Sequence, residues 1–307
     1  MFRYAVARLL GAIPTLFALV TIAFFLVRLA PGGPFDDERQ LPPEIEANLQ
    51  RAYNLDAPLT SQYLRYLGDL ARGDLGPSFK YKDYSVAELI ATGLPATLRI
   101  GLSALVVAVL AGVFCGAVAA LRRNGWVDRV VMTLAMTGIA IPNFVVAPAL
   151  TLLLGVYLRL LPVGGWGDGA FRFLILPVVA LALPKIAYVA RLTRGSLAEV
   201  LGSPYIRTAR AKGLRGTTIL VRHAARAALL PVVSYLGPTA AALLTGSVVI
   251  EQIFGIPGLG RYFVQGALNR DYTLVLGIVL FYGTLIILLN LLADLTYGWL
   301  DPRVRYD

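Results

Sequence analysis

The sequence predicts an all-α membrane protein with six transmembrane helices. Of its 307 residues, 57% are hydrophobic and the mean hydropathy is +0.70, whereas roughly 45–50% of the residues of a soluble domain are apolar. Several uncharged runs reach the roughly 20 residues that a helix needs to cross the hydrocarbon. Arginine and lysine gather in alternate connections between these runs, which is the pattern that sets orientation in a membrane.

Five uncharged runs are long enough to cross a membrane. They are Leu9–Val27, Ile100–Leu121, Val130–Leu158, Ala227–Ile250 and Tyr272–Ala293. A sixth candidate, Phe173–Ala190, contains Pro177, Pro184 and Lys185. A lysine in the middle of a membrane costs roughly 2.5–3.5 kcal/mol on insertion scales, so this is the weakest span. Lys185 either lines a wet cavity or lies near one interface and extends its amine to the surface.

The basic residues predict the orientation of the six spans. Only Arg159, Arg172, Arg261 and Arg270 lie in the short connections on one side. The fifteen on the other side are Arg3, Arg8, Arg122, Arg123, Arg129, Arg191, Arg194, Arg207, Arg210, Lys212, Arg215, Arg222, Arg226, Arg303 and Arg305. Because basic residues resist translocation, both termini and the 191–226 loop are expected in the cytoplasm, with 31–95 outside.

Between the spans, the sequence predicts an outer cap and two outer loops. The first run is read as a retained helix because Arg28 stands just before the only small-residue cleavage site, after Ala30. Segment 31–95 is expected to fold as a small cap with amphipathic helices near Glu44–Tyr53 and Ser61–Arg72. Connections 159–172 and 251–271 are predicted as tight re-entrant or surface loops.

Three further observations limit the function classes. With one cysteine and one histidine, the chain can form neither an internal disulfide nor a Cys/His zinc site. The net charge of +10 is attributed to membrane orientation, and no nucleic acid is expected to bind. Gly112 and Gly116 form a GxxxG pair, for which packing within the chain is favoured over dimerisation.

The long cytoplasmic loop is patterned like a docking element. It is predicted to form two short helices, near Ser203–Lys212 and Thr217–Ala228, separated by Gly213 and Gly216. In the first, the small residues Ala209 and Ala211 alternate with basic residues, so the helix is thin enough to enter a groove and is steered there by charge. The alternative is that the charges only fix topology and contact anionic lipid. The pattern alone leaves both open.

The segment Tyr205-Ile206-Arg207-Thr208-Ala209-Arg210-Ala211-Lys212-Gly213 resembles the cytoplasmic signature loop of ABC importer permeases, specifically the peptide and nickel branch. Ala209 and Gly213 match the general signature, whereas Arg207 and Thr208 depart from it. Further similar segments are 8–17, 28–32, 73–76, 190–196, 251–260, 270–272 and 301–306. Segments 41–44 and 76–86 are most similar to the B-type permease subunit of oligopeptide importers. A dipeptide or nickel permease is the nearest alternative.

This resemblance implies a subunit of a bacterial inner-membrane importer. The chain would pair with a paralogous C-type permease subunit, and two cytoplasmic ABC ATPase subunits would use ATP and Mg, so that this chain binds no cofactor itself and hydrolyses nothing. An extracytoplasmic peptide-binding protein would deliver the substrate. Residues 1–94 would hold the first helix and the cap, and 95–307 a five-helix permease core. Tyr205–Gly213 would be the coupling helix that contacts the ATPase subunits.

The pathway itself is less clearly marked in the sequence. A pathway for peptides of varied sequence needs polar, roomy walls. Asn143, Ser234 and Tyr235 are candidate pathway residues, although kinks at the nearby prolines explain them equally well. A secondary transporter would need carboxylates or histidines inside the membrane, and the five uncharged runs contain none. Hydropathy alone leaves a non-transporting membrane scaffold open.

Overall fold

The described part of the chain is helical. The computed structural model describes residues 2–30, 55–245 and 247–300. Within these ranges the only β-structure is one isolated bridge between Pro77 and Ser85. The all-α prediction is therefore confirmed for the residues that the structure describes.

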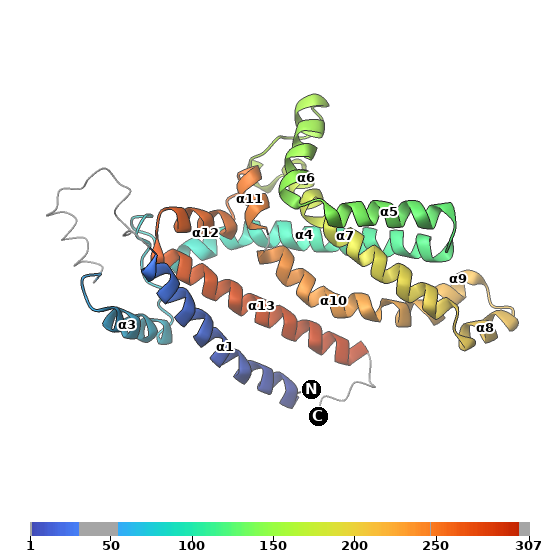
Figure 1. Cartoon of the computed structure of the whole chain (residues 1–307), viewed down its shortest axis with the longest axis horizontal. Coiled ribbons are helices and arrows are strands. Elements are labelled where there is room, and N and C mark those ends of the chain that lie inside the picture. Colours follow the sequence, from blue (N-terminus) through green and yellow to red (C-terminus); the bar gives the residue numbers. More distant parts are fainter. Residues whose placement is uncertain (1, 31–54, 246, 301–307) are drawn as a thin grey trace.

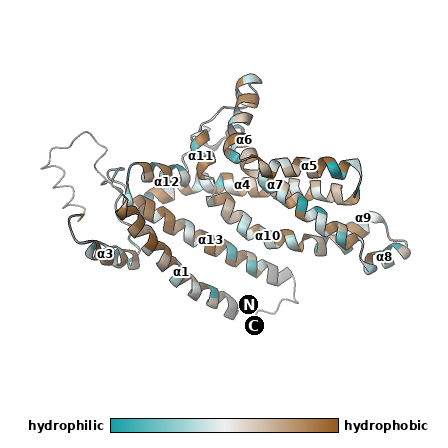
Figure 2. Cartoon of the chain, viewed as in Figure 1, coloured by the Kyte–Doolittle hydropathy of each residue, from teal (hydrophilic) through white to brown (hydrophobic). Residues whose placement is uncertain are grey.

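Five helices are long and apolar enough to cross a membrane. They are α1 (Phe2–Leu29), α4 (Val86–Leu121), α7 (Phe171–Leu201), α10 (Ala225–Thr245) and α13 (Tyr272–Leu300). In Figure 1, α1, α13 and α10 lie side by side, and each is in contact with its neighbour. Figure 2 shows hydrophobic residues along most of α1 and α13, as expected for helices whose side chains face lipid or each other.

The third apolar run is bent into two helices. Here α5 (Trp126–Ala140) is followed by α6 (Asn143–Leu150), which continues as η1 (Thr151–Tyr157), and the two parts meet at 105°. Ile141 between them is extended, with φ −88° and ψ 120°, because the ring of the following proline disfavours a helical conformation there. One continuous helix over this run is therefore a wrong expectation. Six spans result when the bent pair counts as one crossing.

The span with the weakest sequence signal, α7, is the most enclosed. Of its most apolar 18-residue window, 56% is buried, against 17% for α1. Pro177 and Pro184 both lie inside the helix. This helix packs along α4 and also against α5 and α10, and neighbouring helices are one means by which membrane proteins tolerate prolines inside a span. Lys185 is partly exposed on this central helix.

The GxxxG pair lies where α4 contacts α7. A Cβ added to Gly116 would lie 2.4 Å from the Ala190 carbonyl oxygen, and one added to Gly112 would lie 2.6 Å from Val189 Cβ. The two backbones approach this closely only because both side chains are absent. The structure thus supports the interpretation that these glycines pack within the chain.

Short helices gather at the two ends of the molecule. At one end, called here the α8 end, lie α8 (Pro204–Ala211) and α9 (Gly216–Thr218). At the other, the α3 end, lie α3 (Leu59–Ala71) and α12 (Leu259–Leu268). Figure 1 shows α8 and α3 far apart along the longest axis. Two further short elements, α11 (Val248–Phe254) and the 3-10 turn η2 (Gly167–Gly169), lie in the two predicted outer loops.

These short helices revise the predicted connections. The helix expected near Ser61–Arg72 is present as α3, whereas the one expected near Glu44–Tyr53 lies outside the described residues. The 251–271 connection is mostly helical, through α11 and α12. The predicted division between 1–94 and 95–307 falls inside α4, and it stays a prediction.

Replacing Gly116 with valine should destabilise the α4–α7 contact. Overpacking costs about 1–3 kcal/mol, although valine is a better helix former than glycine. The measurement is thermal unfolding of the purified protein in detergent, with Gly195→Val as the control because a Cβ at Gly195 meets nothing within 4 Å. A melting temperature for Gly116→Val equal to that of the control would contradict the close contact.

Candidate functional site

The helix α8 forms for local reasons. Ser203 occupies the N-cap position and Pro204 the first helical position, where proline's fixed φ favours a helix start. After the C-cap residue Lys212, Gly213 has φ +76°, a left-handed conformation that glycine adopts without strain and that ends the helix. The structure thus contains a helix where the sequence predicts one.

The inner face of α8 is packed against the chain itself. Ile206 is completely buried and Ala209 is 7% exposed, and their spacing of three places both on one side of the helix. They belong to an apolar cluster with Ala120, Leu197, Ala198, Ile219, Ala224 and Ala228. Ala209 therefore faces the chain's own body, unlike the expectation that it would enter a partner's groove.

The outer face of α8 is basic and exposed. The exposed residues on this face of α8 are Tyr205, Arg207, Thr208, Arg210 and Ala211. Lys212 and Gly213, which follow the helix, are exposed as well. The Thr208 hydroxyl donates to the Pro204 carbonyl oxygen at 3.1 Å. Three cations within six residues therefore form a surface that would attract an acidic partner.

The second predicted short helix is not separate. From Gly216 the chain runs through α9 and the π-helical turn η3 (Ile219–Ala224) directly into α10. The helical turns are continuous from Gly216 to Thr245. The expectation of an independent helix over Thr217–Ala228 is wrong, because this segment forms the first turns of the helical element that contains α10. As a result, α8 lies between the ends of α7 and α10.

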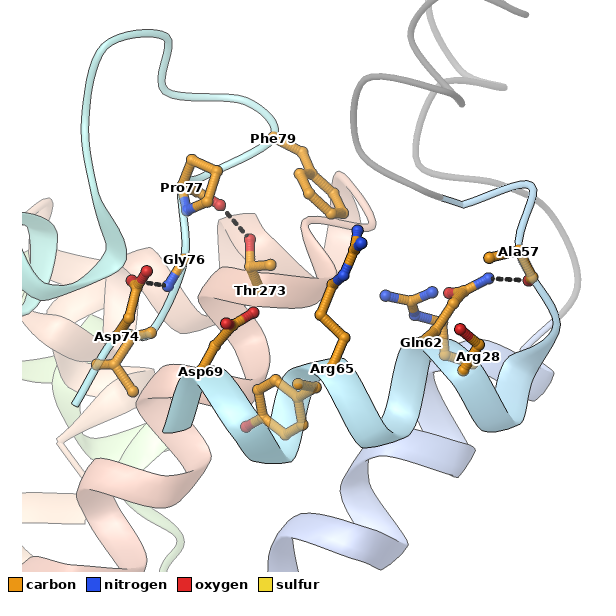
Figure 3. A pocket seen from close by; sticks show the side chains of 13 residues that line it. Arg28, Ala57, Gln62, Arg65, Asp69, Asp74, Gly76, Pro77, Phe79 and Thr273 are labelled. Carbon is orange, nitrogen blue, oxygen red and sulfur yellow. Dashed lines mark hydrogen bonds between the residues drawn. The ribbon is translucent and has the colours of Figure 1, made fainter. Parts of the chain in front are cut away.

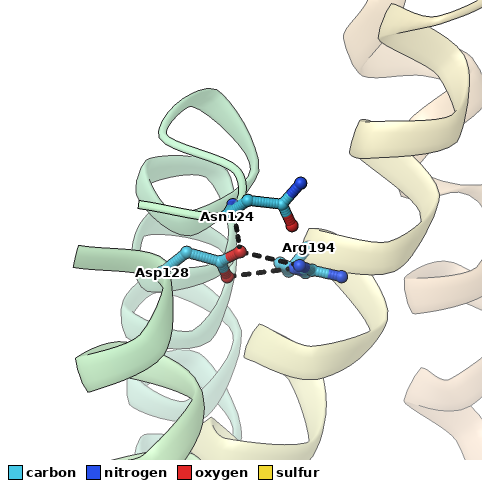
Figure 4. Close-up of polar contacts among 3 residues, drawn as sticks. All are labelled: Asn124, Asp128 and Arg194. Atoms are coloured by element: carbon cyan, nitrogen blue, oxygen red, sulfur yellow. Dashed lines mark hydrogen bonds and ion pairs between the residues drawn. The ribbon is translucent and has the colours of Figure 1, made fainter. Parts of the chain in front are cut away.

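An ion pair joins α5 to the end of α7 near α8 (Figure 4). Arg194 donates from Nη2 to Asp128 Oδ2 at 2.7 Å and from Nε to Oδ1 at 3.0 Å. The Asn124 backbone N–H also donates to Asp128 Oδ2, at 2.9 Å. The Asp128 side chain is 4% exposed and the Arg194 side chain 28%. Such bidentate pairs are geometrically specific, so the α4–α5 connection is fixed to the segment of α7 that leads to α8.

A buried glutamate on α11 holds the glycine-rich segment that follows it. Glu251 has no exposed surface. Its carboxylate accepts hydrogen bonds from Ser247 Oγ at 2.6 Å, the Gly260 backbone N–H at 2.7 Å and Thr97 Oγ1 at 2.9 Å. A Cβ on Gly258 would lie 2.3 Å from Glu251 Oε2. Glycine is therefore required there by the close approach of the carboxylate.

A second buried carboxylate fixes the start of α13. Asp271, with no exposed surface, accepts from the Leu274 backbone N–H at 3.1 Å, which caps the helix. Its other oxygen accepts from the Phe79 backbone N–H at 3.1 Å and from the Ser78 hydroxyl. The segment that precedes α4 is thereby attached to α13.

Comparison with known proteins identifies the family. Residues 108–306 match the family described as "Binding-protein-dependent transport system inner membrane component". The oligopeptide transport system permease protein OppB of Escherichia coli (strain K12) is 54% identical over 306 residues, covering 100% of both chains. The chain belongs to this family. OppB of Haemophilus influenzae is 50% identical over 306 residues, again 100% of both chains. The dipeptide permease DppB of Bacillus subtilis is 44% identical over 305 residues, covering 99% of this chain and 98% of its own.

A solved structure shares the fold of this binding-protein-dependent permease component. A chain of the MetNI methionine ABC transporter, in an inward-facing conformation, aligns with a TM-score of 0.57 at 19% identity. The alignment covers 70% of this chain and 97% of that one. The aligned part of this chain therefore shares the fold of that transporter chain.

The structure places the three candidate pathway residues of the permease on two elements. Asn143 is the first residue of α6, and its Oδ1 is buried with no hydrogen-bond partner among the described residues. Ser234 is exposed on α10 and donates to the Leu230 carbonyl oxygen at 3.1 Å. Tyr235 stacks on Tyr188 of α7, with ring centroids 4.2 Å apart. Their part in a pathway stays a prediction.

The buried carboxylates have no role predicted from the sequence. Asp128 is a lone acid beside Arg122, Arg123 and Arg129, and Glu251 ends an apolar run. Each of these positions indicates that the acid needs hydrogen-bond or ionic partners, because a buried charge is unstable without them. The partners Arg194 and Thr97 are 66 and 154 residues away, so the local sequence does not reveal them.

The contributions of Asp128 and Arg194, the ion pair of Figure 4, to the free energy of unfolding should depend on each other. Asp128→Ala and Arg194→Ala should each lower the free energy of unfolding by about 2–3 kcal/mol, because each leaves a charged group without its partner. The double variant should lose clearly less than the sum, as measured by denaturant unfolding in detergent. Strictly additive losses would contradict a direct interaction.

Proposed function

We propose that the chain is one of the two membrane-spanning subunits of an ATP-driven, binding-protein-dependent importer of oligopeptides. The observation that carries this proposal is the 54% and 50% identity to two OppB permeases over the full length of both chains. A dipeptide importer is the second candidate, favoured by the 44% identity to DppB. In either case the other half of the pathway comes from a paralogous C-type permease subunit.

The proposed orientation places the α8 end and both termini in the cytoplasm. It is supported by the concentration of arginine and lysine at the α8 end, since basic residues resist translocation. The family description supports an inner membrane. The α3 end then faces the outside, where the extracytoplasmic binding protein delivers peptide.

In this proposal α8 is the coupling helix. Two cytoplasmic ATPase subunits bind and hydrolyse ATP with Mg, and the exposed basic face of α8 docks on one of them. Because Ile206 and Ala209 join α8 to the ends of α7 and α10, a shift of α8 moves both helices. The Asp128–Arg194 pair extends the moving unit to α5. The subunit then alternates between inward and outward access as two packed states.

Reversing charge on the exposed face of α8 should break the docking. The variant Arg207→Glu with Arg210→Glu should lower ATP-dependent peptide uptake into proteoliposomes by about tenfold or more, because like charges then meet at the interface. Arg122→Glu, an exposed arginine at the same end but outside α8, is the control. Unchanged uptake and unchanged co-purification of the ATPase subunits in the double variant would contradict the assignment.

Ala209→Glu tests the inner face separately. A carboxylate in the apolar cluster would lack partners, so this variant should reduce the amount of folded protein instead of affecting only transport. Normal folded yield with selective loss of ATPase binding would show that Ala209 faces the partner.

Competition for uptake separates the two candidate substrates. In vesicles that contain the complete importer, an oligopeptide system predicts that a pentapeptide competes with a labelled tripeptide at least as well as a dipeptide does. If only dipeptides competed, the dipeptide candidate would replace the oligopeptide one.

A further inference from the structure

The helices α7 and α10 share a surface that is polar and partly exposed. In Figure 1 the two helices lie side by side and are in contact. Tyr188 of α7 stacks on Tyr235 of α10, with the ring planes 24° apart. Along α10, the exposed residues Pro231, Ser234 and Pro238 recur at spacings of three and four, which places them on one side of the helix. The surface is called here the α7–α10 face, and its polar residues are Lys185, Tyr188, Arg191, Ser234 and Tyr235.

Two cations of this face follow one another along α7. Lys185, Tyr188 and Arg191 are three residues apart, so they project from the same side of the helix. Lys185 is half-buried near the middle of α7, and Arg191 is exposed. The Arg191 guanidinium lies over the Tyr188 ring, 5.0 Å from its centroid. Six residues of helix correspond to roughly 9 Å, so Arg191 lies that much closer to α8 than Lys185 does.

No carboxylate of the described chain pairs with either cation. Neither Lys185 nor Arg191 forms an ion pair with another described residue, and the next acid along α7 is Glu199, about two helical turns beyond Arg191. Charge at the α3 end is arranged differently. There Figure 3 shows Arg65 and Asp69 projecting from α3 around one recess, so cation and acid occur together. The α7–α10 face therefore has a positive charge that the described chain does not balance.

The chemistry of the face indicates water and not lipid beside it. Ionisable side chains in membrane-spanning helices almost always face the interior of a bundle or a water-filled cavity. Here two cations, two phenols and the exposed Ser234 hydroxyl lie on adjoining helices. Phosphates of lipids lie at the membrane surface, outside the hydrocarbon, whereas Lys185 lies near the middle of its helix. An anion that moves through the membrane along this face is therefore a better match for Lys185 than a lipid headgroup.

We propose that Lys185 and then Arg191 bind the terminal carboxylate of a peptide as it passes along the α7–α10 face. The inference rests on the proposed function, and it names the part of the substrate that these residues contact. Every peptide with a free C-terminus carries this carboxylate, so the two cations act on peptides of any sequence. Lysine supplies a flexible point charge and arginine a planar fork that binds a carboxylate through two hydrogen bonds. The order from Lys185 to Arg191 leads towards α8, the end assigned to the cytoplasm.

The test compares two forms of one tripeptide, with a free C-terminal carboxylate or with a C-terminal amide. Initial rates of uptake into vesicles that contain the complete importer are measured at saturating, peptide-loaded binding protein. The quantity compared is the ratio of the acid rate to the amide rate. Any preference of the binding protein itself is the same for every variant of this chain, so it cancels when the ratios of two variants are compared.

Lys185→Gln should lower the ratio of acid to amide uptake by about tenfold, because one hydrogen bond to a charged group is lost. Uptake of the amide should change by less than about twofold, since the amide never depended on the charge. Lys185→Arg should keep the ratio within about twofold of wild type, because it restores the cation. A role of Lys185 in folding alone would lower uptake of both forms equally and would overturn the proposal.

A second variant and a matched control make the result decisive. Arg191→Gln should lower the same ratio by about threefold or more, and this exposed position decides the test if Lys185→Gln does not fold. Arg172→Gln is the control, because Arg172 is an exposed cation of α7 and its spacing of sixteen from Tyr188 places it on the opposite side of the helix. It should change the ratio by less than about twofold.

Three results would overturn the proposal. The first is an unchanged ratio in both Lys185→Gln and Arg191→Gln, which means that the two cations only extend to the membrane surface. The second is an effect that appears only in vesicles of anionic lipid, which assigns the face to a lipid headgroup. The third is loss of the second permease subunit on purification of Lys185→Gln, which assigns the face to a helix of that subunit.

The wild-type importer separates this inference from the proposed function. If the wild type imports neither form of the tripeptide, the proposed function fails and this inference fails with it. If the wild type imports peptide and the variants keep its ratio of acid to amide uptake, only the assignment of the α7–α10 face is wrong.

Discussion

Burial of Ile206 and Ala209 against the ends of α7 and α10 is the contact on which the functional account depends. A helix of eight residues has little stability alone, so α8 keeps its shape and position only through this apolar cluster. The same cluster attaches α8 to the ends of two long helices. Its outer face is left free for a partner, and any force applied there acts on the membrane-spanning part of the chain.

Buried carboxylates extend this rigidity to both ends of the molecule. Asp128 attaches α5 to α7 near α8, whereas Glu251 and Asp271 fix the glycine-rich segment and the start of α13 at the α3 end. Each carboxylate has several hydrogen-bond partners, which a buried charge requires. Between the two ends, the helices meet through small residues such as Gly112 and Gly116. Apolar packing of that kind permits the helices to adopt a second arrangement without leaving charges unpaired.

Features set by nearby residues could be predicted from the sequence, and features set by distant ones could not. The apolar runs predicted the spans, and Gly213 predicted the end of α8, because these signals act within one or two turns. The enclosure of α7 and the inward position of Ala209 depend on contacts with other helices. Pro142 was visible in the sequence, but its effect as a bend of 105° required knowing that Ile141 becomes extended. The resemblance supplied the family, which the comparisons confirm.

The most direct test of the coupling role compares cysteines at positions 209 and 211 in a Cys115→Ser background. A membrane-impermeant maleimide is applied to right-side-out and inside-out vesicles, with and without the ATPase subunits. The account predicts that Ala211→Cys reacts only from the cytoplasmic face and is protected when the ATPase subunits are bound, while Ala209→Cys reacts only after denaturation. Labelling of position 211 from the external face alone, or equal labelling with and without the ATPase subunits, would contradict it.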